Sequence, residues 1–378
     1  MTETAARWAG FGTTIFTEMS ALAERTGAIN LGQGFPDEDG PAAVLEAAAR
    51  AIRDGHNQYA PLPGVPALRE AIAEHQLRFY GIPLDPETEV QVTFGATEAL
   101  AAALLGLCGP GDEVVCFEPY YDSYAAGIAM AGAVRRPITL SPPGWPVDPD
   151  AVAAAITPRA RLLLLNTPHN PTGKVFSREE LEVLARACVD HDLIAITDEV
   201  YEHLVFDGEH VPLSTMPGMA ERTLTISSLG KTFSVTGWKV GWATGPAPLV
   251  AATRKAKQYL TFAGGTPFQH AGAVALRLGD DAYEGLVTDL RDKRDRLCDG
   301  LAAAGLEVLR PAGTYFANAD TGRDGVAYCR ELVERAGVVA IPTGVFYDSD
   351  AGRSLVRFAF CKREAVIDEA ARRLAAKA

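Results

Sequence analysis

The chain alternates short β-type apolar runs with helical patterns from about residue 40 to residue 280, and this alternation constrains the fold more than any other feature. Seven runs have the length and composition of buried strands: EVQVTFG, DEVVCFE, RRPITL, RLLLLN, LIAITDE, RTLTISS and VGWATG. Strands that alternate with helices are typical of a parallel sheet covered by helices. We therefore expect an α/β fold whose large domain, 41–280, holds a mostly parallel seven-stranded sheet flanked by helices.

The pattern changes after Pro267, where longer helical stretches replace the regular alternation. We expect a helix through 286–304, short strands near 306–309, 314–317 and 355–360, and a last helix from Arg363. The sequence therefore predicts a smaller α+β domain over 281–378. The N-terminal arm, 1–40, is expected to form part of it.

The 378 residues include 35 basic and 48 acidic side chains, which gives a net charge of −13. Such a charge repels polyanions, so nucleic acids and anionic membranes are poor partners. The longest apolar run, 99–108, is half the roughly 20 residues that a membrane helix needs, and the N-terminus has no apolar signal-peptide core. We expect a cytoplasmic protein that binds neither nucleic acid nor membrane.

The six cysteines are scattered without CxxC spacing, and the seven histidines show no HExxH or other spacing of metal ligands. Buried, reduced thiols fit this pattern better than a disulfide framework. The sequence predicts no metal site.

Polar side chains gather where four of the predicted strands end, at 95–97, 166–173, 198–201 and 227–239. Ligands of parallel sheets bind at the carboxyl ends of the strands. These four segments therefore hold the candidate functional residues.

Lys231 lies in SSLGKTFSVTGWK, an apolar, glycine-flanked loop after a predicted strand. A lysine in such surroundings loses its proton more easily than one in water, and the neutral amine can form a Schiff base with a carbonyl cofactor. An ordinary surface lysine in a loop would give the same local pattern.

Asp198 ends the apolar strand LIAIT, where a carboxylate is costly to desolvate unless it faces a cation. A pyridinium nitrogen is a fitting cation, and the ring then becomes an electron sink for a carbanion. Tyr201, three residues later, could hydrogen-bond the phenolic oxygen of the same ring. Alternatively, Asp198 caps a following helix and Glu199 is solvated.

Gly95-Ala96-Thr97 stands between a predicted strand and the next helix. The N-terminus of a helix offers free N–H groups and a positive dipole end to a phosphate. Ser228 and Lys239 could add a hydroxyl and a charge to that phosphate. A capping turn with Thr97 as the N-cap would look the same.

Arg357 lies inside the apolar segment SLVRFAFCK. An unpaired guanidinium would be costly there, and a carboxylate bound through two hydrogen bonds would satisfy it. That carboxylate could belong to a substrate or to one of the protein's own acidic residues.

Taken together, these segments resemble the pyridoxal-phosphate-dependent aminotransferases of fold type I, class I/II. The resemblance covers nearly the whole chain and rests on segments in the order of that family: LGQGFPD, NQYxxxxG at 57–64, EPYYDSY, NTPHNPTG, TDEVYEHLVF, SSLGKTFSVTGWKVGW, GTYF and VRFAFCK. The chain is most similar to the subgroup of kynurenine, glutamine and methionine aminotransferases and of proteins labelled N-succinyldiaminopimelate aminotransferases.

The resemblance implies that pyridoxal 5'-phosphate is the cofactor and assigns five residues to its ring. Lys231 would form the Schiff base and then carry the proton, and Asp198 would pair with the pyridine nitrogen. Tyr201 and Asn170 would reach the ring oxygen, and Tyr121 would stack on the ring face.

The same resemblance implies contacts at the two ends of the site. The phosphate would be held by Ala96, Thr97, Ser228 and Lys239, with Tyr59 reaching across from the second subunit of a homodimer with shared active sites. The substrate carboxylate would be held by the backbone of Gly34, Asn170 and Arg357.

The resemblance implies transfer of an amino group between an L-amino acid and a 2-oxo acid. Gly264-Gly265 stand where kynurenine-type relatives carry bulky side chains, so we expect a roomier pocket and a methionine-like, glutamine-like or N-succinyldiaminopimelate-like donor. One alternative is a C–S β-lyase of the cysteine-conjugate type, because the same carbanion can expel a leaving group. A second alternative is a non-enzymatic binding or sensor module of this fold. The presence of Lys231, Asp198 and Arg357 counts against it.

Overall fold

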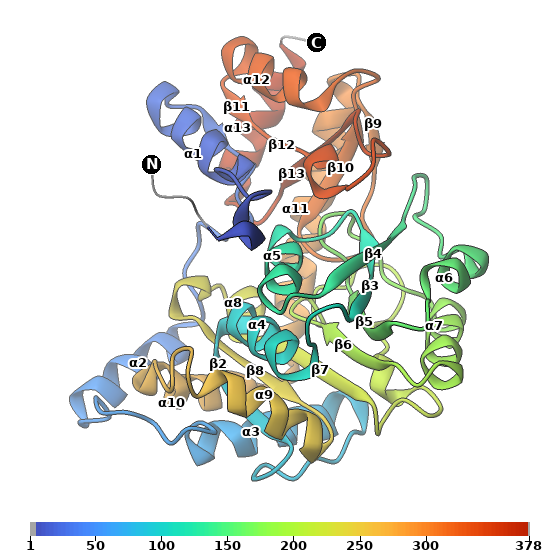
Figure 1. Cartoon of the computed structure of the whole chain (residues 1–378). Coiled ribbons are helices and arrows are strands. Elements are labelled where there is room, and N and C mark those ends of the chain that lie inside the picture. Colours follow the sequence, from blue (N-terminus) through green and yellow to red (C-terminus); the bar gives the residue numbers. More distant parts are fainter. Residues whose placement is uncertain (1–4, 377–378) are drawn as a thin grey trace.

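The computed structural model describes residues 5–376, and its largest element is a seven-stranded sheet in the order β2-β8-β7-β6-β5-β3-β4 (Figure 1). Its strands are β2 (Val90–Phe94), β3 (Glu113–Glu118), β4 (Val134–Thr139), β5 (Ala160–Asn166), β6 (Ile194–Asp198), β7 (Thr223–Ser228) and β8 (Val240–Thr244). Only β8 runs antiparallel to its neighbours. The predicted α/β class and the mostly parallel seven-stranded sheet are confirmed, and each predicted run supplies one strand.

Both faces of this sheet are buried, which explains why its strands are continuously apolar. In β5, Leu162 and Leu164 pack into one core, and Leu163 and Leu165 pack into the core on the opposite face. The first core is closed by α4 (Gly95–Leu107), α5 (Asp122–Met130) and α9 (Ala247–Lys257). The opposite face is closed by α6 (Pro149–Ala155), α7 (Arg178–Asp190), α2 (Ala42–Arg53), α3 (Pro66–Tyr80) and α10 (Thr266–Leu276).

A second region, at the top of Figure 1, is built on a four-stranded antiparallel sheet in the order β12-β13-β10-β9. Its strands are β9 (Glu307–Leu309), β10 (Phe316–Asp320), β12 (Ile341–Pro342) and β13 (Leu355–Ala359). Its helices are α11 (Asp280–Ala303), α12 (Gly325–Ala336) and α13 (Glu364–Ala375). The predicted C-terminal helices and strands all have counterparts here, whereas α12, β11 and β12 were not predicted. The domain boundaries after residues 40 and 280 stay a prediction.

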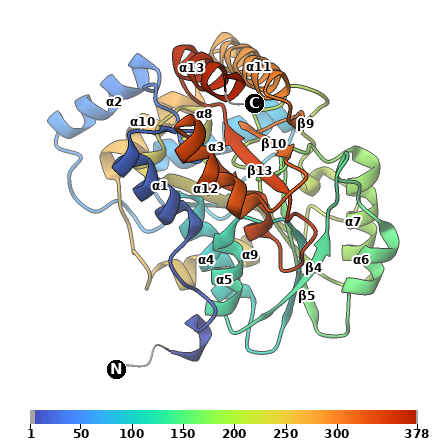
Figure 2. The ribbon, with the colours of Figure 1, turned by 90° about the horizontal axis from the view of Figure 1, so that it is seen from above.

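The N-terminal segment packs against this second region. Strand β1 (Ile29–Asn30) pairs in parallel with β11 (Val338–Val339), and α1 (Ile15–Thr26) lies beside α12 (Figure 2). Met19 and Ala23 of α1 join the same core as α12 and β13. Residues 15–30 therefore lie against the C-terminal part of the chain, and the extent of the N-terminal arm, 1–40, stays a prediction.

The remaining elements are short. They are α8 (Leu229–Thr232) and the 3₁₀ helices η1 (Ala6–Trp8), η2 (Leu213–Thr215), η3 (Thr236–Trp238) and η4 (Thr343–Phe346). Over residues 5–376, no helix combines the length and apolar character that crossing a bilayer requires. All six cysteines are free thiols.

The topology brings the predicted functional segments together. Strands β5, β6 and β7 are parallel, and β2 points the same way as β7 because both are antiparallel to β8. The carboxyl ends of these four strands therefore meet at one edge of the sheet, which is where ligands of such sheets bind.

Candidate active site

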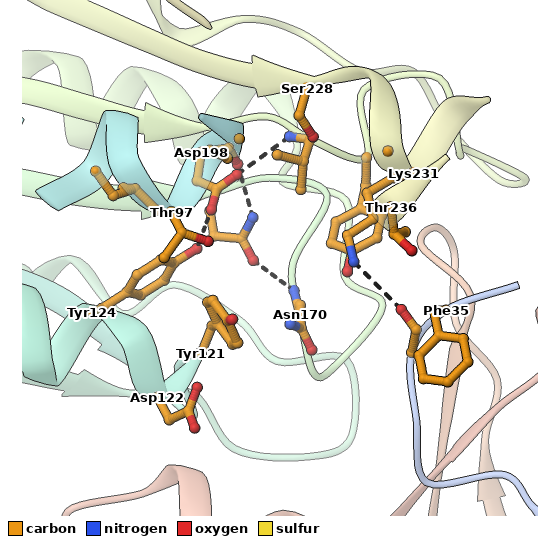
Figure 3. Close-up of a pocket in the computed structure, with 18 of the residues that line it drawn as sticks. Phe35, Thr97, Tyr121, Asp122, Tyr124, Asn170, Asp198, Ser228, Lys231 and Thr236 are labelled. Atoms are coloured by element: carbon orange, nitrogen blue, oxygen red, sulfur yellow. Dashed lines mark hydrogen bonds between the residues drawn. The ribbon is translucent and has the colours of Figure 1, made fainter. Parts of the chain in front are cut away.

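A single pocket lies at this edge, lined also by residues of the N-terminal segment and of the four-stranded sheet (Figure 3). Eleven of the predicted site residues line it: Gly34, Ala96, Thr97, Tyr121, Asn170, Asp198, Tyr201, Ser228, Lys231, Lys239 and Arg357. Tyr59 does not. Segments from all parts of the chain thus converge on one cavity.

Lys231 lies in α8, directly after β7, and its side chain enters the pocket rather than the outer surface (Figure 3). Its Nζ lies 3.4 Å from the backbone oxygen of Gly34, to which it donates. Burial lowers the pKa of Lys231 to about 8. Near neutral pH the amine therefore exchanges its proton readily, as a nucleophile and a general base must.

Asp198 is the last residue of β6 and is buried at the base of the pocket. Its Oδ2 accepts a hydrogen bond from Tyr124 Oη at 2.7 Å, and its Oδ1 accepts one from the backbone N–H of Val200 at 3.3 Å. Burial raises the pKa of Asp198 to about 6. No helix begins at Asp198, so the capping interpretation is wrong.

Within residues 5–376, no lysine, arginine or histidine lies within 4.0 Å of the Asp198 carboxylate, the limit for an ion pair. A buried carboxylate in this position is stabilised by a cationic N–H donor from a ligand. A protonated ring nitrogen meets that requirement.

The far end of the pocket suits a phosphate, because α4 begins there at Gly95 and the residues of its first turn line the cavity. Lys239 Nζ donates to Thr97 Oγ1 at 3.3 Å. A Cβ on Gly241 would stand 2.6 Å from the backbone nitrogen of Ala96, so only glycine lets β8 approach this turn. The N-cap of α4 is Phe94, so Thr97 lies inside the first turn and its predicted alternative role as the N-cap is wrong.

A chain of hydrogen bonds fixes the two sides of the pocket relative to each other. Asn166 Nδ2 donates to the backbone oxygen of Asp198 at 2.8 Å, and Asn166 Oδ1 accepts from the backbone N–H of Asn170 at 2.7 Å. Asn170 Oδ1 in turn accepts from Arg357 Nη1 at 3.0 Å. The position of Arg357 is therefore tied to the end of β6.

Arg357 is 2% exposed on β13, and its guanidinium lies 4.0 Å from the centre of the Phe316 ring. Its Nη2 donates to the backbone oxygen of Gly32 at 3.1 Å, whereas its buried Nε has no partner. Burial lowers the pKa of Arg357 to about 10. In the described part of the chain no carboxylate lies within 4.0 Å of it, so the internal salt bridge is not formed. A ligand carboxylate would supply the missing charge.

Some lining residues were not predicted, above all Tyr124, Asn166 and Asp122 (Figure 3). Tyr124 follows Tyr121 by three residues at the start of α5, and this helical spacing could have indicated that both rings face the pocket. The spacing of Asn166 and Asn170 gives no comparable signal, because their contact depends on the loop after β5.

Tyr59 lies outside the pocket and is 79% exposed, with the ring of Phe262 5.6 Å away in an edge-to-face contact. Gly264, near Phe262, does not leave an empty space. A Cβ on Gly264 would stand 3.0 Å from the Phe94 ring. Phe94 therefore takes up part of the room that the glycine pair was expected to open.

The residues fit a ligand that combines a phosphate, a basic ring nitrogen and a carbonyl, as pyridoxal 5'-phosphate does. The helix N-terminus with Lys239 suits the phosphate, the buried Asp198 suits the ring nitrogen, and Lys231 suits the carbonyl. The unpaired Arg357 remains for the carboxylate of a second ligand.

Comparisons with known proteins agree with this geometry. The family model described as "Aminotransferase class I and II" matches residues 26–374. The chain is 53% identical to a protein of Mycobacterium tuberculosis named "Probable N-succinyldiaminopimelate aminotransferase DapC", over 98% of both chains. It is 46% identical to the "Methionine aminotransferase" of Escherichia coli, over 96% of this chain and 95% of the relative. The solved structure of N-succinyldiaminopimelate aminotransferase from Mycobacterium tuberculosis superposes with a TM-score of 0.97 at 54% identity, and each chain is covered fully.

Proposed function

This chain belongs to the class I and II aminotransferases, and from that premise we propose that its amino donor is an L-amino acid with a long, uncharged side chain of the methionine or glutamine type. The protein is a pyridoxal-phosphate-dependent enzyme that transfers an amino group to a 2-oxo acid. The comparisons give no support to the C–S lyase or to the non-enzymatic module.

The proposed mechanism assigns the proton to Lys231. Pyridoxal phosphate, when bound, supplies a conjugated ring that accepts the electron pair left on the substrate Cα. Lys231 Nζ takes the Cα proton, for which its lowered pKa suits it, and later returns a proton to the product. Asp198 holds the proton on the ring nitrogen, and the hydrogen bond from Tyr124 keeps the carboxylate oriented.

The remaining contacts hold and orient the two ligands. We assign the ring oxygen to Tyr201 and to the amide of Asn170, and the ring face to Tyr121. The phosphate is assigned to Ser228, Lys239 and the first turn of α4. Each of these residues lines the pocket, which supports the assignment.

Arg357 is assigned to the α-carboxylate of the substrate, together with Asn170 and the backbone of Gly34. Arg357 has an unpaired Nε and no ion-pair partner in the described chain. These two observations support a substrate with a carboxylate, as every amino acid has. A substrate held at its carboxylate presents its Cα to Lys231 in a fixed orientation, which lowers the entropic part of the barrier.

The side-chain preference rests on the charges that line the pocket. Arg357 is the only arginine among the lining residues within 5–376, and Asp122 adds a carboxylate to the same wall. Burial raises the pKa of Asp122, and the nearby Arg357 acts against that rise. A donor with a second carboxylate close to its Cα, as in aspartate, would place that carboxylate on the wall of Asp122 rather than beside an arginine, so aspartate should be a poor donor.

The 53% identity to a probable N-succinyldiaminopimelate aminotransferase favours that N-acylated diamino acid as a second candidate donor. The test is a panel of donors, including methionine, glutamine, N-succinyldiaminopimelate, kynurenine and aspartate, mixed with the holoenzyme while the cofactor absorbance is followed. We expect methionine or glutamine to react fastest by kcat/KM. If aspartate reacted fastest, the proposed donor class would be wrong.

We also propose that the active enzyme is a homodimer in which Tyr59 serves the neighbouring site. Four exposed apolar side chains, Tyr59, Tyr259, Leu260 and Phe262, lie in two nearby segments, and Tyr59 contacts Phe262. Large exposed aromatic residues gathered in this way are typical of protein interfaces.

Subunit complementation tests the shared site. Lys231→Ala and Tyr59→Ala homodimers, each impaired, are mixed under conditions in which subunit exchange is demonstrated. If Tyr59 acts across the interface, the mixed dimer has one site with both lesions and one intact site, so activity returns. No recovery would mean that Tyr59 acts within its own subunit.

Finally, we propose that the enzyme works in the cytoplasm. All six cysteines are unpaired in the structure and five of them are buried, an arrangement that suits a reducing compartment. Detection of the enzyme in an oxidising compartment by cell fractionation would contradict this.

A further inference from the structure

A second polar cluster lies outside the active-site pocket, beneath the end of β6. Asp198 and Tyr201 line the pocket, whereas Glu202 and His203 of the same turn do not. Glu202 instead accepts a hydrogen bond from Ser227 of β7 at 2.5 Å, and His203 meets His75 of α3. None of the roles assigned above uses His75, Glu202 or His203, which we call the His–Glu cluster.

The His–Glu cluster has the composition and the compactness of a metal site. The Nε2 atoms of His75 and His203 are 2.7 Å apart, and a carboxylate oxygen of Glu202 lies with them inside a 4.8 Å limit for every pair of ligand atoms. Zinc binds histidine nitrogen and carboxylate oxygen at about 2.0–2.2 Å, which places tetrahedral ligands roughly 3.3–3.5 Å apart. The two Nε2 atoms would have to move apart by about 0.6–0.8 Å to reach that spacing.

Glu202 provides a second, independent observation. It is 5% exposed, and its buried Oε2 has no hydrogen-bond partner within 3.5 Å, although the Tyr80 hydroxyl lies near enough to interact with this carboxylate. Buried carboxylate oxygens are almost always satisfied, so an unpartnered one beside two imidazoles points to a missing cation.

The charged side chains around the cluster have partners of their own. The charge of Arg78, which would oppose a bound cation, is balanced by its ion pair with Asp280. Glu199, hydrogen-bonded to His210 at 2.9 Å, adds a further carboxylate close by.

The surroundings of the His–Glu cluster allow an ion to enter from solvent and hold the Glu202 carboxylate in place. His203 is partly exposed, so solvent reaches the cluster from its side. The hydrogen bond from Ser227 orients the Glu202 carboxylate, in the way that outer-shell partners orient metal ligands. Two imidazoles and one carboxylate suit Zn²⁺ or a similar transition metal better than Mg²⁺ or Ca²⁺.

We propose that His75, Glu202 and His203 bind a divalent transition metal ion of the zinc type, with water as the fourth ligand. The sequence predicts no metal site because its argument depends on ligand spacing, and these ligands come from two segments far apart in the chain. Glu202 follows Asp198 by four residues and accepts a hydrogen bond from Ser227, the neighbour of Ser228, so a bound ion would stabilise the turns that carry these active-site residues.

The test measures zinc bound by the holoenzyme. The protein is freed of metal with a chelator, returned to buffer without amino acids, and titrated with Zn²⁺ alone. We expect one zinc ion per chain and a rise in Tm on binding. The variants His75→Gln and His203→Gln should each weaken binding at least about tenfold.

Two histidines outside the cluster provide matched controls. His191→Gln changes an exposed residue, and His56→Gln removes the ring contact with His270, whose ring centre lies 3.9 Å from that of His56. Both control variants should bind zinc as the unchanged protein does. Equal zinc affinity in His75→Gln, His203→Gln and the unchanged protein, or loss of binding only in His56→Gln, would overturn the proposal.

A second measurement covers the case in which the cluster variants fail to fold. Crystals of the unchanged holoenzyme, exposed to Zn²⁺, should give an anomalous-scattering peak at the zinc edge about 2.0–2.2 Å from the three ligand atoms. The absence of a peak there, with His75 and His203 still hydrogen-bonded to each other, would show a plain hydrogen-bonded network instead.

Discussion

The two walls of the active-site pocket are built in different ways. On one wall, Asp198 ends β6 and Lys231 follows the neighbouring strand β7, so strand pairing places them at the same edge of the seven-stranded sheet. On the other wall, Arg357 meets the backbone of Gly32, 325 residues away in sequence, and belongs to a different sheet. Strand pairing thus fixes the positions of the residues on the first wall. The second wall, to which we assign the substrate carboxylate, is assembled from segments near the two ends of the chain.

This difference predicts a division of kinetic effects. Changes on the wall of the seven-stranded sheet should lower kcat, because those side chains act on the proton and the ring. Changes on the wall of the four-stranded sheet should raise KM, because those side chains hold the substrate.

The largest effect is expected for Lys231→Ala. Loss of the general base should lower kcat by about a hundredfold to ten-thousandfold, while the phosphate and ring contacts still allow the cofactor to bind. Steady-state kinetics and the cofactor absorbance of the purified variant measure both effects. Lys255→Ala, at an exposed position of α9, is the control and should behave as the unchanged enzyme does. Near-normal turnover by Lys231→Ala would remove this lysine from the mechanism.

Asp198→Asn should come next. The neutral amide keeps the shape of the side chain but no longer stabilises a positive charge on the ring nitrogen, a loss of about 1.5–3 kcal/mol or roughly 10- to 150-fold in rate. Single-turnover measurement of the amino-donor half-reaction isolates this step. Asp190→Asn, exposed at the end of α7, serves as the control. An unchanged single-turnover rate would contradict the role of Asp198.

Arg357→Lys tests the opposite wall. Lysine keeps the charge but cannot make the two parallel hydrogen bonds of a guanidinium, so kcat/KM should fall by about tenfold or more. Most of that loss should appear as a higher KM. If kcat fell and KM did not change, the division between the two walls would be wrong.

Tyr124→Phe should have the smallest effect. It removes the 2.7 Å hydrogen bond to Asp198, worth about 1 kcal/mol or roughly fivefold in kcat. That bond lowers the pKa of Asp198, which burial otherwise raises. Without it, more Asp198 is protonated at low pH, so the loss of kcat should be larger at pH 6 than at pH 8. An equal loss at both pH values would show that Tyr124 acts only through packing.

The seven strands of the large sheet could be predicted because each is a continuous apolar run, long enough to stand out between helical patterns. Strands β11 and β12 could not, because each has two residues and no periodicity can be recognised at that length. Their place depends on pairing with β1 and β13.

The candidate site divides in the same way. Asp198 and Lys231 could be located from local sequence, because a strand end and a glycine-flanked loop are visible there. The chain of hydrogen bonds from Asn166 through Asn170 to Arg357 could not be located from sequence, because it depends on how the loop after β5 meets the distant strand β13. Phe94 filling the space beside Gly264 is a tertiary contact of the same kind.

The central claim is that Lys231 is the residue that joins the cofactor, and borohydride reduction of the holoenzyme tests it most directly. Reduction makes the link between lysine and cofactor permanent, and mass spectrometry of the digested protein locates it. The account predicts a pyridoxyl group on the peptide that contains Lys231. A pyridoxyl group on any other lysine, with Lys231 unmodified, would contradict it.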